Sequence, residues 1–183
     1  MRNVYLDYSA TTPVKEEVLK EMLPYFTEKF GNPSSLYDTG LEAKAAVTHA
    51  REQVAALIHA DPKEVFFTAG GTESDNWALF GACDKLKEKG NHIITTKIEH
   101  HAILHSCAFL EKHGFDVTYV GIDKDGRVNL KELEDAITDK TILISVMMVN
   151  NEIGTVQPIR EIAKIAKAHK ILFHTDAVQA LGN

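Results

Sequence analysis

From about residue 62 onward, short apolar runs of β-type residues alternate with amphipathic stretches of helical period, and this alternation constrains the fold most strongly. The runs are rich in Val, Ile and Phe, which is typical of strands buried on both faces of a parallel sheet. Strand–helix–strand repetition at this spacing indicates right-handed crossover units, hence an α/β fold with a mostly parallel sheet and helices on both faces. We expect strands at residues 64–68, 92–96, 116–120, 141–147 and 171–174, and helices at about 73–88, 101–113, 129–138 and 159–169.

Two further helices are predicted ahead of this region. The first has Thr12 as its N-cap and Pro13 at its first helical position, and it runs toward Phe30. The second spans about residues 41–58, because its apolar residues recur on one helical face.

The composition restricts the class of partner. With 183 residues, 44% of them hydrophobic, the chain can bury one sizeable core. A net charge of −6 argues against nucleic acid or an anionic membrane as the main partner. No signal-peptide pattern opens the chain and its longest apolar run, residues 142–149, is too short to cross a membrane, so we expect a cytoplasmic protein. We expect an N-terminal segment, 1–14, followed by one partial domain, 15–183.

A glycine-rich turn at residues 66–74 is the strongest local signal. Gly70 and Gly71 follow a predicted strand, and a helix then starts with Thr72. Free backbone N–H groups and the positive end of the helix dipole converge at such a point, so the turn is suited to bind phosphate. It matches neither the dinucleotide fingerprint nor the P-loop. A plain strand–helix turn with a Ser/Thr cap is the alternative.

Three histidines follow the next strand. His100 lies where open α/β sheets place ligands, and is suited to stacking or acid–base chemistry. His101 and His105 are spaced to face one way on a helix, but no third metal ligand lies nearby, and we expect no metal site. Exposed surface histidines are the alternative.

Polar residues also follow the last two strands. Asn150 and Asn151 come after one strand, and Asp176 and Gln179 after the next. An Asx turn and a helix cap are the simpler interpretations of these groups. Together with the glycine turn and His100, however, they supply what pyridoxal phosphate requires: a phosphate anchor, a ring-stacking imidazole and a carboxylate for the pyridine nitrogen.

Other candidate motifs predict only structure. The acidic turn at residues 123–126 has its glycine too early for an EF-hand, and a turn followed by Asn129 and Glu132 as a capping-box pair explains it better. Cys83 and Cys107 form no CxxC motif and fall in predicted helices, where small apolar packing is expected of them.

Across its whole length the sequence resembles the N-terminal half of a NifS/IscS-type cysteine desulfurase, in the class V aminotransferase group of fold-type I pyridoxal-phosphate enzymes. No single motif is decisive, but all of them occur in family order. The matching stretches are YLDYSATTP at 5–13, GNPSS at 31–35, GGTESDN at 70–76, EH at 99–100, NNEIGTVQ at 150–157 and HTDAVQ at 174–179.

The resemblance implies a role for each polar residue of the predicted site. Many relatives carry alanine at the position of Gly71, a change that the phosphate contact is expected to tolerate. By position, Gly71 and Thr72 would bind the cofactor phosphate, His100 would stack on the ring and move protons, Asn151 would contact the phenolic side, Asp176 would pair with the pyridine nitrogen, and Gln179 would bond the phenolate oxygen.

The family chemistry converts L-cysteine to L-alanine and passes the sulfur to an enzyme cysteine, for iron–sulfur clusters or thio-cofactors. The resemblance further implies a homodimer in the full-length family and a sulfur-acceptor or scaffold protein as partner. The cofactor-holding lysine would fall beyond Asn183, and the persulfide cysteine is also missing, so we expect this chain to be inactive alone. The pair His169–Lys170 precedes the fifth strand, on the wrong side of the sheet.

Two other interpretations remain open. One is a related fold-type I enzyme, such as a selenocysteine lyase or an aminotransferase. The other is a noncatalytic half-protein that a partner chain completes.

In the family the strand order is 3-2-4-5-6-7-1, which would leave residues 64–68 without their usual neighbour. We therefore expect the chain alone to be poorly stable or prone to aggregation.

Overall fold

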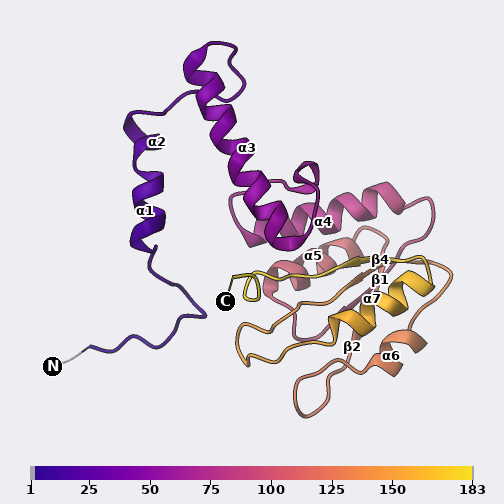
Figure 1. The fold of residues 1–183 in the computed structure, drawn as a ribbon. Coiled ribbons are helices and arrows are strands. Elements are labelled where there is room, and N and C mark those ends of the chain that lie inside the picture. The colour runs from indigo at the N-terminus through magenta and orange to yellow at the C-terminus, as the bar shows by residue number, and fades with distance from the viewer. Residues whose placement is uncertain (1–2, 183) are drawn as a thin grey trace. The chain divides into compact units, whose positions relative to one another are not determined.

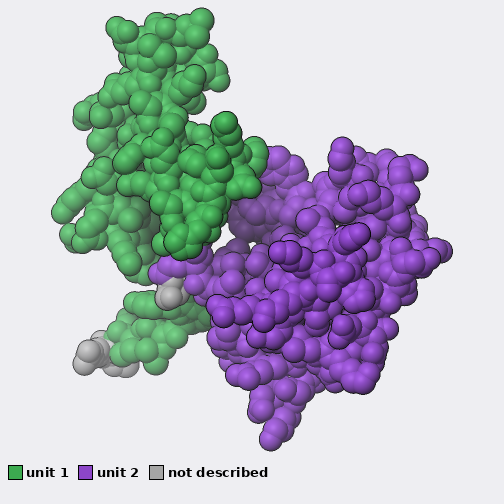
Figure 2. Space-filling model, turned by 45° about the vertical axis from the view of Figure 1, so that its right-hand side comes forward, with its two compact units in different colours: residues 1–67 green, residues 68–183 purple. Residues whose placement is uncertain are grey.

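A computed structural model of the protein describes residues 3–182. The chain divides into two compact units, residues 1–67 and residues 68–183, which Figure 2 colours separately. The first unit is helical, and the second contains the sheet and every residue of the predicted cofactor site.

The first unit consists of short and long helices without a strand among its described residues. Most of its large apolar side chains are exposed, including Leu36 at 91% and Phe30 at 75%. Its elements are α1 (Glu16–Met22), α2 (Pro24–Thr27), α3 (Asp38–Ile58) and the 3₁₀ helix η1 (Pro62–Glu64).

The first predicted helix is wrong at both ends. Thr12 does not cap it; α1 begins at Glu16, and no side chain caps its N-terminus. Pro24 interrupts the helix and begins α2, because proline lacks the amide hydrogen and its ring clashes with the preceding turn. The helical segment therefore ends at Thr27, short of Phe30. The second predicted helix is confirmed as α3, which starts three residues earlier.

The predicted strand at residues 64–68 does not form. Asp61 caps η1 with a capping box that includes Glu64, and the chain from Val65 to Thr68 has no regular structure. A strand exists only through backbone bonds to a neighbour, and the four-stranded sheet does not include this segment. Phe66 and Phe67 are 65% and 50% exposed, as residues outside a sandwiched sheet are.

The second unit is a parallel sheet covered by helices on both faces (Figure 1). The strand order is β2-β1-β3-β4, and all three pairings are parallel, with Ile94 of β1 opposite Thr118 of β2 and Ile144 of β3. This order confirms the 3-2-4-5 part of the order that the resemblance implies. The strands are β1 (His92–Thr96), β2 (Asp116–Val120), β3 (Thr141–Ser145) and β4 (Leu172–His174).

Two apolar clusters hold the helices to the sheet. On one face, Leu79 of α4 and Ile103 of α5 pack with Ile93 of β1. On the other face, Ile162 of α7 packs with Ile144 of β3. Each cluster buries several full aliphatic side chains, each of which contributes about 1.5–3 kcal/mol. The helices are α4 (Gly71–Leu86), α5 (His101–Glu111), α6 (Leu130–Asp135) and α7 (Ile159–Ala168).

The predicted capping box before α6 is half confirmed. Asn129 caps the helix by accepting hydrogen bonds from the backbone N–H groups of Lys131 and Glu132. The Glu132 carboxylate does not return to Asn129 but accepts from the Gly121 N–H at 3.0 Å. It thereby ties α6 to the end of β2. Among the described residues, none of the helices has the length and apolar content that crossing a bilayer requires.

Candidate functional site

The N-terminus of α4 is open to an anion. Its N-cap is Gly70, and no side chain caps the first turn. Ser74 and Glu73 are engaged in the turn itself, since Ser74 Oγ lies 2.7 Å from Thr68 Oγ1 and Glu73 accepts from the Ala69 N–H. The Thr72 hydroxyl has no hydrogen-bond partner among the described residues. The helix start therefore offers unused N–H groups and one hydroxyl.

Gly71 lies against the loop that follows β4. A Cβ atom at this position would come within 2.6 Å of Cγ2 of Val178. The expected tolerance of alanine here therefore depends on Val178 moving, in addition to the backbone contact with an anion. The α4 N-terminus and the loop after Asp176 are direct neighbours.

His100 is the N-cap of α5. Its Nδ1 accepts a hydrogen bond from the Ala102 N–H at 3.1 Å, so the proton of the neutral ring sits on Nε2. The cap fixes the orientation of an exposed ring at the carboxyl end of β1. A ring held this way can stack on a planar ligand and offer its Nε2 proton.

Thr72 and His100 line the same cleft, which has a volume of about 690 Å³ and lies between α4 and α5. The two helices are joined there by the Ser106 hydroxyl, which donates to Asn76. His101 and His105 also line this cleft, with their rings 5.3 Å apart. Within residues 3–182, no group of three or more metal-ligating side chains is arranged to hold a metal ion.

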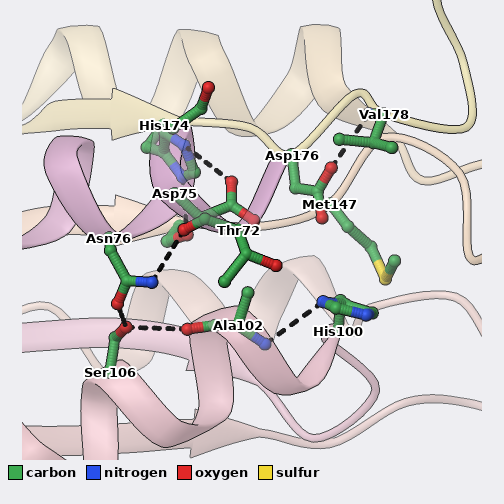
Figure 3. A network of polar contacts seen from close by, with 12 residues as sticks. Thr72, Asp75, Asn76, His100, Ala102, Ser106, Met147, His174, Asp176 and Val178 are labelled. Carbon is green, nitrogen blue, oxygen red and sulfur yellow. Dashed lines mark hydrogen bonds and ion pairs between the residues drawn. The ribbon is translucent and has the colours of Figure 1, made fainter. Parts of the chain in front are cut away.

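Asp176 lies just past β4, 7% exposed. Its backbone carbonyl accepts from the Met148 N–H at 2.8 Å, and its Oδ1 accepts from the Val178 N–H at 2.9 Å. Its second carboxylate oxygen has no hydrogen-bond partner within residues 3–182. Asp176 is not among the residues lining the α4–α5 cleft. The loop that carries it contacts the start of α4 through Val178 and Gly71, and Figure 3 draws Asp176 in the same close view as Thr72 and His100.

The two predicted amides lie on the loops at the same edge of the sheet. Asn151 is half-buried in the turn after β3, and its side chain makes no hydrogen bond within the described part of the chain. Its neighbour Asn150 is structural, because its amide bonds the Ile98 carbonyl and accepts from two N–H groups of its own turn. Gln179 is half-buried in the loop after β4.

Two buried carboxyl groups that sequence reasoning did not assign accompany Asp176. Asp75 on α4 is 4% exposed and Glu99 after β1 is 5% exposed. The Glu99 carboxylate accepts the Met147 N–H with both oxygens at 3.0 Å and the Thr96 hydroxyl at 2.6 Å, which ties the ends of β1 and β3 together.

His174, the last residue of β4, connects three elements. Its Nδ1 lies 2.9 Å from the Ser145 hydroxyl of β3, and its Nε2 lies 3.7 Å from Oδ1 of Asp75 (Figure 3). Burial lowers the pKa of His174, although the charge of Asp176 opposes this. A neutral ring directs its single proton to one of the two partners.

The buried acids of this region are shifted toward their protonated forms. Burial raises the pKa of Asp75 to about 7, with a further contribution from Asp176, and burial also raises the pKa of Glu99 to about 7. None of the ion pairs among the described residues gives these acids a Lys or Arg partner. A cationic ligand group would therefore be stabilised here.

A signal for Asp75 was present in the sequence. Asp75, Leu79 and Cys83 are spaced four residues apart and all three are buried, so the acid occupies a core-facing helical position. For Glu99 the signal is weaker, since a polar residue after a strand is common. His174 has no local signal, because its partners lie 29 and 99 residues away.

The residues present fit a ligand with an anionic and a cationic end. The uncapped start of α4 suits a phosphate, and the buried Asp176 suits a protonated ring nitrogen. The hydroxyl of Thr175, next to Asp176, is buried without a hydrogen-bond partner within residues 3–182. The groups that such a ligand would satisfy are the unused N–H groups of the first turn of α4 and the carboxylate oxygen of Asp176 that Val178 does not contact.

Comparison with known proteins gives consistent matches. The model of the family "Aminotransferase class-V" matches residues 4–183. Cysteine desulfurase IscS of Clostridium botulinum (strain Kyoto / Type A2) is 60% identical over 182 residues, covering 100% of this chain and 46% of that protein. Cysteine desulfurase IscS of Methanosarcina thermophila is 58% identical over 180 residues, covering 98% of this chain and 45% of that protein.

Solved structures agree. A NifS-like protein superposes with a TM-score of 0.95 at 42% identity, covering 98% of this chain and 50% of that one. The structure titled "SspA in complex with cysteine" gives a TM-score of 0.93 at 44% identity, covering 96% of this chain and 51% of that one. The chain thus spans about half the length of the relatives it matches.

Proposed function

Because the chain belongs to the class V aminotransferase family, we propose that it is the cofactor-binding half of a pyridoxal-phosphate-dependent cysteine desulfurase. The observation that carries the proposal is the pairing of an uncapped helix N-terminus with a buried, cation-free carboxylate at the same edge of the sheet. The resemblance to IscS and NifS-like proteins supports L-cysteine as substrate.

Each predicted site residue then has a physical role. The backbone N–H groups from Gly71 onward and the Thr72 hydroxyl bind the phosphate, assisted by the helix dipole. Asp176 holds the proton of the ring nitrogen with the carboxylate oxygen that Val178 does not occupy. When bound, the cofactor supplies an electron sink for the substrate carbon that bears the amine.

The remaining groups orient the ring. His100, fixed by its cap on α5, covers one face of the ring and carries a proton on Nε2. Asn151 and Gln179 contact the phenolic side. Both amides lie on loops at the carboxyl edge of the sheet, where α/β proteins of this topology bind ligands.

The proposal extends to the whole enzyme. The sequence contains no Ser-x-His-Lys segment that would hold the cofactor covalently, and Lys170 precedes β4 at the opposite edge of the sheet. We therefore expect no alanine release from L-cysteine by this chain with added cofactor; measurable turnover would contradict this assignment. We further propose that the whole enzyme is a cytoplasmic homodimer that donates sulfur to an acceptor or iron–sulfur scaffold protein. Within this chain, we propose a segment 1–14 followed by a partial domain over residues 15–183.

Ligand binding by the 183-residue chain tests the proposal. Pyridoxine 5′-phosphate is the suitable probe, because it has the phosphate, ring nitrogen and phenolic oxygen but no aldehyde to react with surface lysines. We expect saturable binding in equilibrium dialysis, weakened by about 30- to 100-fold in Asp176→Asn. Asp84→Asn, which changes an exposed acid on α4, serves as the control. The test is made on a chain that shows a cooperative unfolding transition; no binding by this folded wild-type chain, or equal binding by Asp176→Asn, would contradict the proposal.

A further inference from the structure

The imidazole of His174 links the sheet to α4 near the proposed cofactor site. It lies between the Ser145 hydroxyl of β3 at 2.9 Å and the Asp75 carboxylate of α4 at 3.7 Å. Its side chain is 18% exposed, and that of Asp75 is 5% exposed. Because both side chains are largely withdrawn from water, this contact is screened less than an ion pair between two solvated side chains.

The link reaches both ends of the proposed ligand. Asp75 comes one helical turn after Gly71, so whatever holds Asp75 also holds the start of α4. Asp176 comes two residues after His174, and the backbone between them stays paired with the exit of β3, through Val146 N–H to the His174 carbonyl and Met148 N–H to the Asp176 carbonyl. His174 is thus connected to the Asp176 carboxylate through the paired backbone and to α4 through its side chain.

We propose that Asp75 and His174 are positioning residues that set the separation between the anion-binding start of α4 and the Asp176 carboxylate. The inference rests on the proposed function, in which one ligand carries a phosphate at one end and a protonated ring nitrogen at the other. Neither residue touches the ligand. The pair selects a ligand of the right span, because its rigid contacts keep the two binding ends at one distance.

The test compares a ligand that spans both ends with one that occupies a single end. Pyridoxine 5′-phosphate spans the site, whereas inorganic phosphate occupies only the start of α4. In His174→Gln we expect the dissociation constant of pyridoxine 5′-phosphate to rise about tenfold, as is typical when a residue that orients a binding group is removed. The dissociation constant of inorganic phosphate should stay within about twofold.

His92 provides a matched control. It is a second buried histidine of the same sheet, with ring nitrogens 2.7 Å from the Thr141 hydroxyl and 2.9 Å from the Thr118 hydroxyl, at the amino end of β1. We expect His92→Gln to bind both ligands as the wild-type chain does. General loosening of the fold would instead weaken both ligands in both variants, and that result would overturn the inference.

Asp75→Asn keeps the shape of the side chain and carries the test if His174→Gln loses its cooperative unfolding transition. We expect the same selective, about tenfold loss for the spanning ligand. Unchanged binding of both ligands by Asp75→Asn and His174→Gln would overturn the positioning role and leave the proposed function intact. Absence of pyridoxine 5′-phosphate binding in a wild-type chain that unfolds cooperatively would overturn both.

Discussion

Each end of the same sheet holds a largely buried histidine, and the two rings differ in the groups that they contact. At the amino end, both ring nitrogens of His92 lie against hydroxyl groups, and burial lowers the pKa of the ring although the charge of Asp116 opposes this. At the carboxyl end, His174 lies among buried acids, with Asp75 and Asp176 nearby.

The difference separates a structural from a functional polar core. Neutral groups that satisfy one another stabilise a fold at little electrostatic cost, whereas buried carboxylates without a cation cost free energy until a ligand compensates them. Such an uncompensated electrostatic cost is expected where a protein binds a charged ligand. On the proposed function, the amino end stabilises the fold and the carboxyl end binds the ligand.

The largest expected effect concerns the amino end. His92→Ala removes a 6%-exposed ring and the hydrogen bonds that this ring makes with the Thr118 and Thr141 hydroxyls. The free energy of unfolding should therefore fall by about 3 kcal/mol. Urea denaturation measures this loss. Binding of pyridoxine 5′-phosphate at a temperature where the variant is folded should not change. A selective loss of binding would erase the contrast between the two ends.

An intermediate effect concerns Glu99. Its pKa in the folded state is raised to about 7, so the stability contributed by the protonated form is complete below about pH 4.5 and is lost as the pH rises through 7. Glu99→Gln cannot ionise. The unfolding free energy of the wild-type chain relative to Glu99→Gln should therefore fall by roughly 2 kcal/mol between pH 5 and pH 8. Parallel pH profiles for the two proteins would show that Glu99 is ionised throughout.

The smallest effect distinguishes two adjacent threonines of β1. The Thr95 hydroxyl is buried without a partner within residues 3–182, while that of Thr96 donates to Glu99. Thr95→Val should raise the free energy of unfolding by about 1 kcal/mol, and Thr96→Val should lower it by a similar amount. Chemical denaturation of the two variants side by side checks this. Equal destabilisation by the two substitutions would mean that the Thr95 hydroxyl is hydrogen-bonded in solution.

The sequence predicted those parts of the fold that short-range pattern determines. β1 and β2 have the predicted bounds, but only β1 is buried along its whole length, since β2 lies at the edge of the sheet and is partly exposed. The strand predicted at 64–68 failed because a strand depends on a neighbour that local sequence does not reveal. The helix predicted from Thr12 begins only at Glu16, and Pro24 divides it before Phe30.

The candidate site divides in the same way. The positions of His100 and Asp176 at one edge of the sheet were predictable, because both follow strands of a parallel sheet. Thr72 was placed there from a strand that does not form, and the roles of all three residues toward a cofactor stay predictions. The Asp75–His174 contact joins residues 99 positions apart, and it depends on the packing of α4 over β3 and β4. Only the assembled fold places these two side chains together.

The two buried cysteines are natural probes of how often the α4–α5 face of the sheet opens. Cys83 and Cys107 are 1% and 0% exposed in the same apolar cluster, and burial raises the pKa of Cys83 to about 11. Thiol reagents react with the exposed thiolate, so alkylation proceeds only when this layer opens. The rate of labelling of native protein therefore reports how often the helices lift from the sheet beneath the site.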